Sequence, residues 1–203
     1  ELTDALTGEA APYNLVFTTN GIASTTASVV TAALGLRDLD ALTETDVERV
    51  RRAHLLLAMF NALQPGVFAL SGWDLVGALP VPVDDIAELV REGDTRWIHR
   101  PAYDLLDVAP QASASASGMP RARTLHGPID AQLDDPTSFV SRLRDLLHLR
   151  GYFAIATTRQ VDVPDVAHPA MLVMVHAYEQ VPGQLQVTVL NFGEEPISGT
   201  VIS

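Results

Sequence analysis

Trp73 and Asp74 are the neighbouring residues whose types best suit the binding of a ligand. An indole offers a flat apolar surface to the C–H face of a sugar ring, and a carboxylate beside it accepts hydrogen bonds from sugar hydroxyls. In the plainer alternative, Trp73 packs in the interior and Asp74 caps the turn that follows. Taken by themselves, the two residues favour the plainer alternative.

Asn20 is a second candidate, because it ends a short apolar run at residues 14–19. An amide there can both donate and accept hydrogen bonds to a ligand, although Asn-Gly is also an ordinary turn dipeptide. If both runs are parallel strands, Asn20 and the Trp73–Asp74 pair emerge at the same edge of a sheet, where α/β proteins bind ligands.

Several kinds of site are disfavoured by the sequence. The six histidines lack the paired spacing of a zinc site, and no Gly-x-Ser-x-Gly elbow, phosphate loop or dinucleotide fingerprint occurs. Glycoside chemistry normally needs two carboxylates flanking the scissile bond, and no convincing pair follows the predicted strands. We expect no metal and no cofactor.

Composition limits the partners. The chain has 203 residues, 47% of them hydrophobic, no cysteine and a formal net charge of -12. Nucleic acid and anionic membranes would repel such a chain, and no apolar run is long enough to span a bilayer. The absence of cysteine fits a reducing compartment, so we expect a cytoplasmic protein. Homo-oligomerisation is left open.

The first part of the chain predicts a βαβ unit. Residues 14–20 and 67–70 are apolar and β-branched, as in buried parallel strands. Between them a helix is expected to begin at Thr45, where Glu48 completes a capping box. Residues 75–123 are predicted to be mostly irregular.

The second part predicts a helix followed by an antiparallel sheet. The helix is expected to begin at Asp135-Pro136 and to end at Gly151. Three closely spaced runs then predict antiparallel strands, at residues 171–176, 185–190 and 197–202. We place a boundary near residue 160, between domains 1–160 and 161–203. Both ends of the sequence look like cuts, so we expect more chain before and after it.

Several motifs, in order, resemble the α-amylase clan (glycoside hydrolase family 13). Residues 48–77 resemble the seventh helix and eighth strand of its (β/α)8 barrel, with Gly72-Trp73-Asp74 at the strand end. Residues 134–139, followed by Leu149-Arg150, resemble the final barrel helix. Residues 187–192 are similar to a strand of the β domain that follows the barrel. Within the clan, residues 14–23, 60–66 and 163–166 are similar to bacterial trehalose synthases.

The resemblance implies a fold and an activity. The fold would be the C-terminal part of a (β/α)8 TIM barrel, followed by the start of a β-sandwich domain. The activity would be the interconversion of maltose and trehalose through a covalent glucosyl-enzyme, with free glucose as a side product. The family's nucleophile and acid precede residue 1, so this chain would hold no catalytic residue and would need the N-terminal part of the same enzyme as its partner.

Three site residues follow from the resemblance. The family's third carboxylate normally lies in an Asn-His-Asp triplet, where this sequence has Asn20-Gly21-Ile22. We therefore carry over only Asn20 and Asp74, with Trp73 beside them, as substrate-binding residues. Two alternatives stay open, a hydrolase of α-glucosides and a non-catalytic carbohydrate-binding relative. The departure at Gly21-Ile22 favours the second of these.

Overall fold

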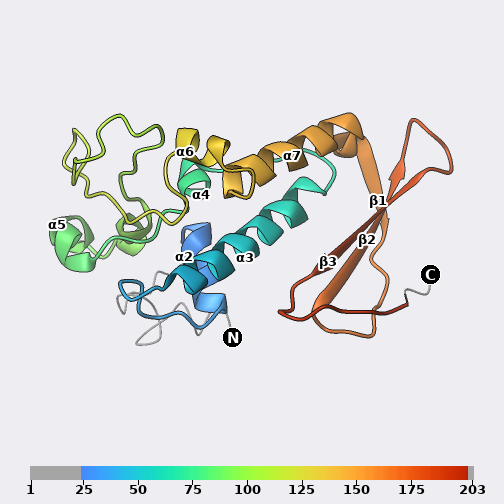
Figure 1. Ribbon diagram of the computed structural model, residues 1–203, viewed down its shortest axis with the longest axis horizontal. Helices are drawn as coiled ribbons and strands as arrows, with labels where there is room; N and C mark the ends of the chain where they lie inside the picture. Colours follow the sequence, from blue (N-terminus) through green and yellow to red (C-terminus); the bar gives the residue numbers. More distant parts are fainter. Residues whose placement is uncertain (1–23, 201–203) are drawn as a thin grey trace. The chain divides into compact units, whose positions relative to one another are not determined.

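The computed structural model describes residues 24–200, except for the side chain of Thr95 (Figure 1). The described residues form two compact units, residues 24–54 with 70–141 and residues 55–69 with 142–200. The long helices α3 (Glu44–Ala62) and α7 (Phe139–Tyr152) each contribute residues to both units. The predicted domain boundary at residue 160 stays a prediction.

The first unit is helical, with a long irregular segment. Its core contains α2, the start of α3, α4 and the start of α7, and residues 77–128 form only short helical turns and isolated bridges. Val81, Ile86 and Ile98 form a small buried cluster that anchors this segment. The shorter helices of the unit are α2 (Thr26–Ala33), α4 (Gly72–Val76), η3 (Val83–Ile86), α5 (Ala87–Val90), η4 (Thr95–His99) and α6 (Ile129–Asp134).

Helix α3 begins where a capping box can form, although one residue earlier than predicted. The Thr43 backbone N–H donates to the Asp46 carboxylate at 3.0 Å, and the Asp46 backbone N–H donates to the Thr43 hydroxyl at 3.2 Å. Such reciprocal bonds satisfy N–H groups that have no partner within the helix. Glu48 pairs with Arg51 on the helix surface. The helix prediction is therefore confirmed, with Thr43 and Asp46 as the capping pair instead of Thr45 and Glu48.

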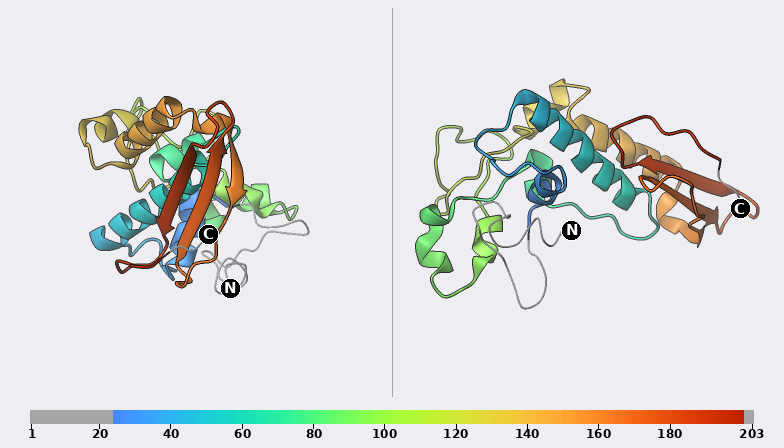
Figure 2. Two further views of the ribbon diagram at one scale, coloured as in Figure 1. Left: turned by 90° about the vertical axis from the view of Figure 1, so that its right-hand side faces the viewer. Right: turned by 90° about the horizontal axis from the view of Figure 1, so that it is seen from below.

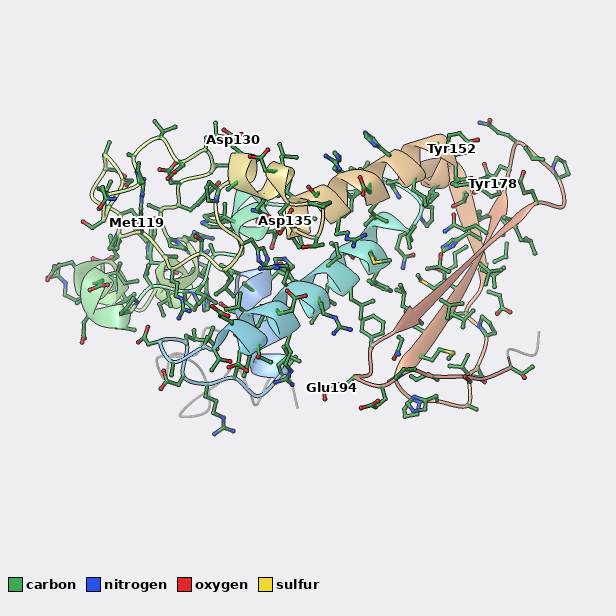
Figure 3. All side chains as sticks on the ribbon, in the orientation of Figure 1. Met119, Asp130, Asp135, Tyr152, Tyr178 and Glu194 are labelled. Carbon is green, nitrogen blue, oxygen red and sulfur yellow. The ribbon has the colours of Figure 1, made fainter. Side chains whose placement is uncertain are left out.

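Helix α7 begins later than the Asp-Pro signal indicated. Asp135 accepts hydrogen bonds from the Thr137 backbone and hydroxyl, which closes a turn before the helix. Ser138 then caps the first helical turn by accepting from the Ser141 backbone N–H. The helix continues to Tyr152, one residue past Gly151, and the Tyr152 side chain points outward at its end (Figure 3).

The second unit contains an antiparallel sheet of three strands in the order β1–β2–β3 (Figure 2). The strands are β1 (Thr158–Asp162), β2 (Met171–Tyr178) and β3 (Leu185–Asn191). The two predicted strands at residues 171–176 and 185–190 are confirmed, as is their antiparallel pairing. β1 was not predicted, because its sequence is mostly polar. Residues 197–200 form no strand, and residues 201–203 lie outside the described part.

The predicted βαβ unit does not appear among the described residues. Residues 67–70 form no strand, and the side chain of Val67 is 97% exposed. A strand forms only when a neighbour pairs with its backbone, and the predicted partner at residues 14–20 lies outside the described part. The described chain thus combines helices with an antiparallel sheet, and neither a barrel nor a sandwich is formed by residues 24–200. None of its helices is long and apolar enough to cross a membrane.

Arg150, near the end of α7, holds the second unit together. The side chain is buried, and its guanidinium donates hydrogen bonds to the carbonyls of Ala62, Gln64 and Gly66. The last carbonyls of a helix have no partner within the helix, and the guanidinium at the end of α3 satisfies them. Its positive charge also interacts favourably with the negative end of the helix dipole. The bonds also fix the turn that follows α3.

Replacing Arg150 with Met is expected to lower the free energy of unfolding by about 3 kcal/mol, because three carbonyls, that of Ala62 buried, lose a charged donor. Urea unfolding followed by circular dichroism measures the change. The matched control is Arg144→Met on the same helix, where an exposed ion pair with Asp145 is lost and about 0.5 kcal/mol or less is expected. Equal effects of the two substitutions would show that Arg150 is not a structural clamp.

Candidate functional site

The candidate site of the first unit is centred on the carboxylate of Asp74. Asp74 lies in the first turn of α4, and its Oδ2 accepts hydrogen bonds from the Ser71 backbone N–H at 3.0 Å and the Ser71 hydroxyl at 2.7 Å. The Asp74 N–H donates back to the Ser71 hydroxyl, which completes a capping box. Only 12% of the Asp74 side chain is exposed, so these bonds replace most of its contact with water.

The second carboxylate oxygen faces a buried histidine. The Nε2 atom of His54 lies 3.4 Å from Oδ1 of Asp74, and His54 is 1% exposed. The other ring nitrogen of His54, Nδ1, lies 3.1 Å from Nε2 of His126. Asp74, His54 and His126 therefore form a linear polar chain, which we call the Asp-His-His chain.

The position of each proton along this chain follows from the carboxylate at its end. Since an ionised carboxylate only accepts hydrogen bonds, Nε2 of His54 must be the donor that faces Asp74. Nδ1 of His54 and Nε2 of His126 share the next hydrogen bond, and the tautomers of the two rings decide which nitrogen donates. In a neutral His54 that donates from Nε2, Nδ1 accepts and His126 is the donor. Nδ1 of His126 is buried and has no hydrogen bond of ordinary geometry among the described residues.

Aromatic and backbone contacts hold the two imidazoles in place. The His126 ring stacks on Phe139 at a centroid distance of 4.8 Å, and the His54 ring tilts against the same phenyl at 4.5 Å. Gly77 packs against the other side of His126, where a Cβ atom would lie only 2.7 Å from the ring. Phe139, fully buried at the first position of α7, forms the apolar floor of the site.

Gln132 links the elements that carry the site. Its side-chain amide donates to the carbonyls of Leu75 and Gly127, each at 2.8 Å, and accepts from the Val140 N–H at 3.1 Å. These bonds tie α4, the loop after His126 and the first turn of α7 to one buried side chain. The mutual positions of Asp74, His126 and Phe139 are fixed as a result.

The electrostatics of the site keep the carboxylate charged and His126 neutral. Burial alone would raise the pKa of Asp74, but hydrogen bonds from His54, Thr26 and Ser71 hold that pKa well below its usual range. Burial lowers the pKa of His126 to about 3, and the nearby His54 and Arg51 contribute further to the decrease. The site is therefore an anionic group beside a neutral imidazole in an apolar setting.

The Trp73 side chain contacts Pro101 and Tyr103. Its indole N–H donates to the Pro101 carbonyl at 2.8 Å, and its ring packs against Tyr103 at a centroid distance of 5.8 Å. The ring stays partly exposed, so its packing leaves some aromatic surface open to solvent. Both roles considered for the Trp73–Asp74 pair remain compatible with these contacts, because a capping carboxylate and an anchored indole can also border a ligand.

The structure describes two of the three predicted site residues. Trp73 and Asp74 lie together at α4, whereas Asn20 lies outside the described residues. The sequence analysis missed the roles of His54 and His126, which are 72 positions apart and meet only in the fold. One usable signal was present, since His54 is a titratable residue within an otherwise apolar helical stretch.

No group of three or more His, Asp or Glu side chains suited to a metal ion occurs within residues 24–200. The side chains of the Asp-His-His chain contact one another in line, so their nitrogen and oxygen atoms do not converge on a common point. The arrangement holds the neutral imidazole of His126 in a fixed orientation, with His54 between it and the charged carboxylate of Asp74.

No protein-family model matches this chain, and neither does any curated protein.

Substitution of Gly77 by Ala tests the packing of His126. Gly77 and Gly35 both have positive φ, +61° and +71°, but a Cβ atom at Gly35 meets nothing within 4 Å. Gly35→Ala should cost about 1 kcal/mol of unfolding free energy, the penalty for left-handed backbone. Gly77→Ala should cost about 1–2 kcal/mol more, because the new methyl group displaces a ring held by Phe139 and His54. Similar losses in the two variants, measured by urea unfolding, would contradict the proposed packing.

Stability should fall as the solution is acidified from about pH 6.5 to about pH 3. In this window the unfolded chain protonates His126, whose ordinary pKa is about 6.5, while the folded chain keeps it neutral. The folded pKa is the lower of the two, so the stabilisation is complete above pH 6.5 and is lost on acidification. The slope for this one group is at most about 1.4 kcal/mol per pH unit.

Two measurements check this dependence. Proton NMR of the His126 ring should show no titration between pH 7 and about pH 4. In His126→Phe, the dependence of the urea midpoint on pH should become weaker, while the aromatic stacking on Phe139 is retained. A His126 resonance that titrates near pH 6.5 would rule out the buried neutral state.

Proposed function

We propose that this chain is the C-terminal part of a cytoplasmic enzyme of the α-amylase clan that interconverts maltose and trehalose. The observation that carries the proposal is the Trp73–Asp74 pair, an aromatic ring beside a fixed and ionised carboxylate. In the sequence, the pair lies where the resemblance places the end of the eighth barrel strand, although residues 67–70 form no strand in the structure. The order of the further motifs, up to the strand at β3, supports the same assignment.

In this proposal the chemistry begins on residues outside the chain. A carboxylate nucleophile attacks the anomeric carbon of maltose, while an acid protonates the departing oxygen and releases glucose within a closed pocket. The freed glucose turns, and its anomeric hydroxyl attacks the glucosyl-enzyme while the carboxylate left by the acid takes the hydroxyl proton. This step gives the 1,1-linked product and releases the nucleophile. Water must be excluded during this interval, since it would otherwise hydrolyse the intermediate.

Asp74 would act in this reaction as a positioning residue. Its two oxygens are engaged by Ser71 and His54, and only a small part of the side chain is exposed. Such a carboxylate fixes the start of α4 and the adjacent Trp73, and thereby one wall of the substrate pocket. Trp73 offers its exposed aromatic surface to a sugar ring, and Asn20 would complete the same edge.

The activity is tested by incubating the full-length protein with maltose and following the products by carbon-13 NMR. The proposal predicts trehalose as the main product, with little glucose. Glucose alone would favour the hydrolase. No turnover would favour a non-catalytic carbohydrate-binding relative. The residues Asn20-Gly21-Ile22, which depart from the family's Asn-His-Asp triplet, support that alternative.

The role of Asp74 is tested by Asp74→Asn in the same assay. Loss of the charge that orients His54 should lower the rate of trehalose formation about tenfold to a hundredfold, the usual effect of a misplaced positioning residue. The glucose share of the product should rise, because a loosened wall admits water. The matched control is Asp130→Asn on the exposed surface of α6, visible in Figure 3, which should change neither quantity. An unchanged product ratio in Asp74→Asn would contradict the positioning role.

A further inference from the structure

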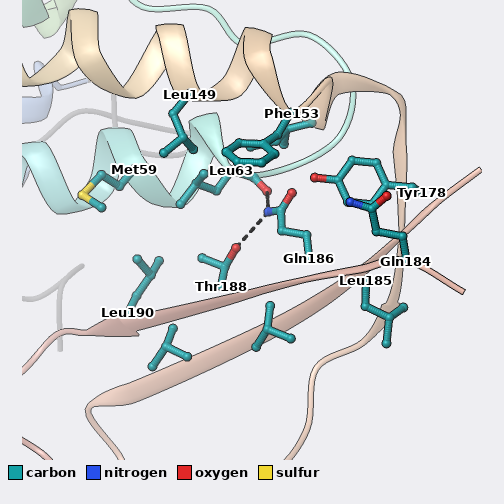
Figure 4. Close-up of a pocket in the computed structure, with 13 residues that line it drawn as sticks. Met59, Leu63, Leu149, Phe153, Tyr178, Gln184, Leu185, Gln186, Thr188 and Leu190 are labelled. Atoms are coloured by element: carbon teal, nitrogen blue, oxygen red, sulfur yellow. Dashed lines mark hydrogen bonds between the residues drawn. The ribbon is translucent and has the colours of Figure 1, made fainter. Parts of the chain in front are cut away.

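The second unit contains a cavity that the proposed reaction does not use. It has a volume of about 410 Å³, within the range of small-molecule sites. It is bordered by the end of α3, the end of α7 and the face of β3 that points toward these helices (Figure 4). Its lining includes the side chains of Met59, Phe153, Tyr178, Gln184, Gln186 and Thr188.

The lining of this cavity is uncharged. Apart from aliphatic side chains it consists of two aromatic rings, two amides and one threonine hydroxyl, and no Asp, Glu, Lys, Arg or His borders it. An ionic ligand would lose its hydration here without gaining a counter-charge, which is strongly unfavourable. A ligand suited to this lining has an apolar face and neutral hydrogen-bonding groups.

Buried polar atoms beside the cavity lack partners. The Gln186 amide nitrogen donates to the Thr188 hydroxyl at 2.9 Å and to the Leu63 carbonyl at 3.3 Å, but its oxygen Oε1 is buried without a partner among the described residues. His176 lies directly across from Gln186 in the sheet, is 0% exposed, and has no partner within residues 24–200 for either ring nitrogen. Burial lowers the pKa of His176, so the ring is neutral and offers one donor and one acceptor.

The amide oxygen of Gln186 and the neutral ring of His176 are suited to hydrogen bonds with hydroxyl groups. A hydroxyl both donates and accepts, so a ligand hydroxyl in the cavity can satisfy the oxygen of Gln186, which lines it. His176 does not border the cavity, so a bridging water is needed to link a ligand to its ring nitrogens. Phe153 is 45% exposed and borders the cavity, where its ring can lie against an apolar ligand face. A ring compound with several hydroxyls and an apolar C–H face combines both requirements.

We propose that this cavity binds one uncharged saccharide unit, as a second site separate from the Asp-His-His chain. The choice of a saccharide among hydroxylated ligands rests on the proposed function. Gln186 and Gln184 supply hydrogen bonds from β3 and the turn before it, and Phe153 supplies the stacking surface from the end of α7.

The test uses methyl groups of methionine as local reporters in the full-length protein. Met59 borders the cavity, whereas Met119 lies in the first unit and serves as an internal control. With carbon-13 methyl-labelled methionine, and with Met59 assigned by Met59→Leu, methyl α-glucoside is titrated into the sample. Methyl α-glucuronide, in which a carboxylate replaces the C6 hydroxymethyl group, is the matched charged probe.

The proposal predicts a saturable shift of the Met59 signal with methyl α-glucoside, none at Met119, and at least about tenfold weaker binding of the glucuronide. Phe153→Ala and Gln186→Leu should each weaken the glucoside about tenfold, while Gln111→Leu, an exposed Gln of the first unit, should not. No saturable shift, equal binding of both probes, or unchanged binding in both cavity variants would overturn it.

The same samples separate this inference from the proposed function. Trehalose formation without a Met59 response would overturn only the second site. A Met59 response without any turnover of maltose would overturn only the proposed activity. Both cavity variants are expected to retain trehalose formation, because their residues lie outside the unit that carries Asp74.

Discussion

The first unit depends on keeping one carboxylate ionised in a largely apolar interior. A buried charge is tolerated only when hydrogen bonds replace the water it has lost, and Asp74 receives them from Ser71, His54 and Thr26. Each donor belongs to a different stretch of chain. Segments far apart in sequence are thereby held to one point, and a half-satisfied arrangement would be less stable than an apolar one.

The second unit meets a related constraint with the opposite charge. Arg150 is buried and donates to the carbonyls of Ala62 and Gln64 at the end of α3. Its partners are backbone atoms, which makes the clamp independent of the side chains at Ala62 and Gln64. In contrast, both ring nitrogens of His176 and the side-chain oxygen of Gln186 are buried without a hydrogen-bond partner in the described part of the same unit. Because its hydrogen bonds are satisfied within the protein, we interpret Arg150 as structural. The unsatisfied atoms of His176 and Gln186 instead suggest a ligand.

The elements that depend on local signals could be predicted from the sequence, and those that depend on distant partners could not. α3 and α7 follow from apolar periodicity, and β2 and β3 from β-branched runs separated by a turn. Residues 67–70 carry the same strand signal but pair with no described neighbour. The start of α7 moved to Phe139 because Asp135 and Thr137 close a turn of their own.

The candidate site was predictable only in part for the same reason. Trp73 and Asp74 are adjacent, so their combination is visible in the sequence. His54 and His126 come from a helix and a loop, and nothing in their spacing indicates that their rings lie 3.1 Å apart at the nearest nitrogens. A buried polar chain of this kind is a property of the packing.

The most direct test of this account is nitrogen-15 NMR of the His54 and His126 rings in the wild-type protein and in Asp74→Asn. In the wild type both rings should carry their proton on Nε2, because the carboxylate accepts from His54. In the variant, the new amide keeps its oxygen toward the Ser71 donors, so its NH2 group turns toward His54 and both rings should move their proton to Nδ1. A His126 tautomer that is the same in both proteins would contradict the account, since the three side chains would then not act as one hydrogen-bonded chain.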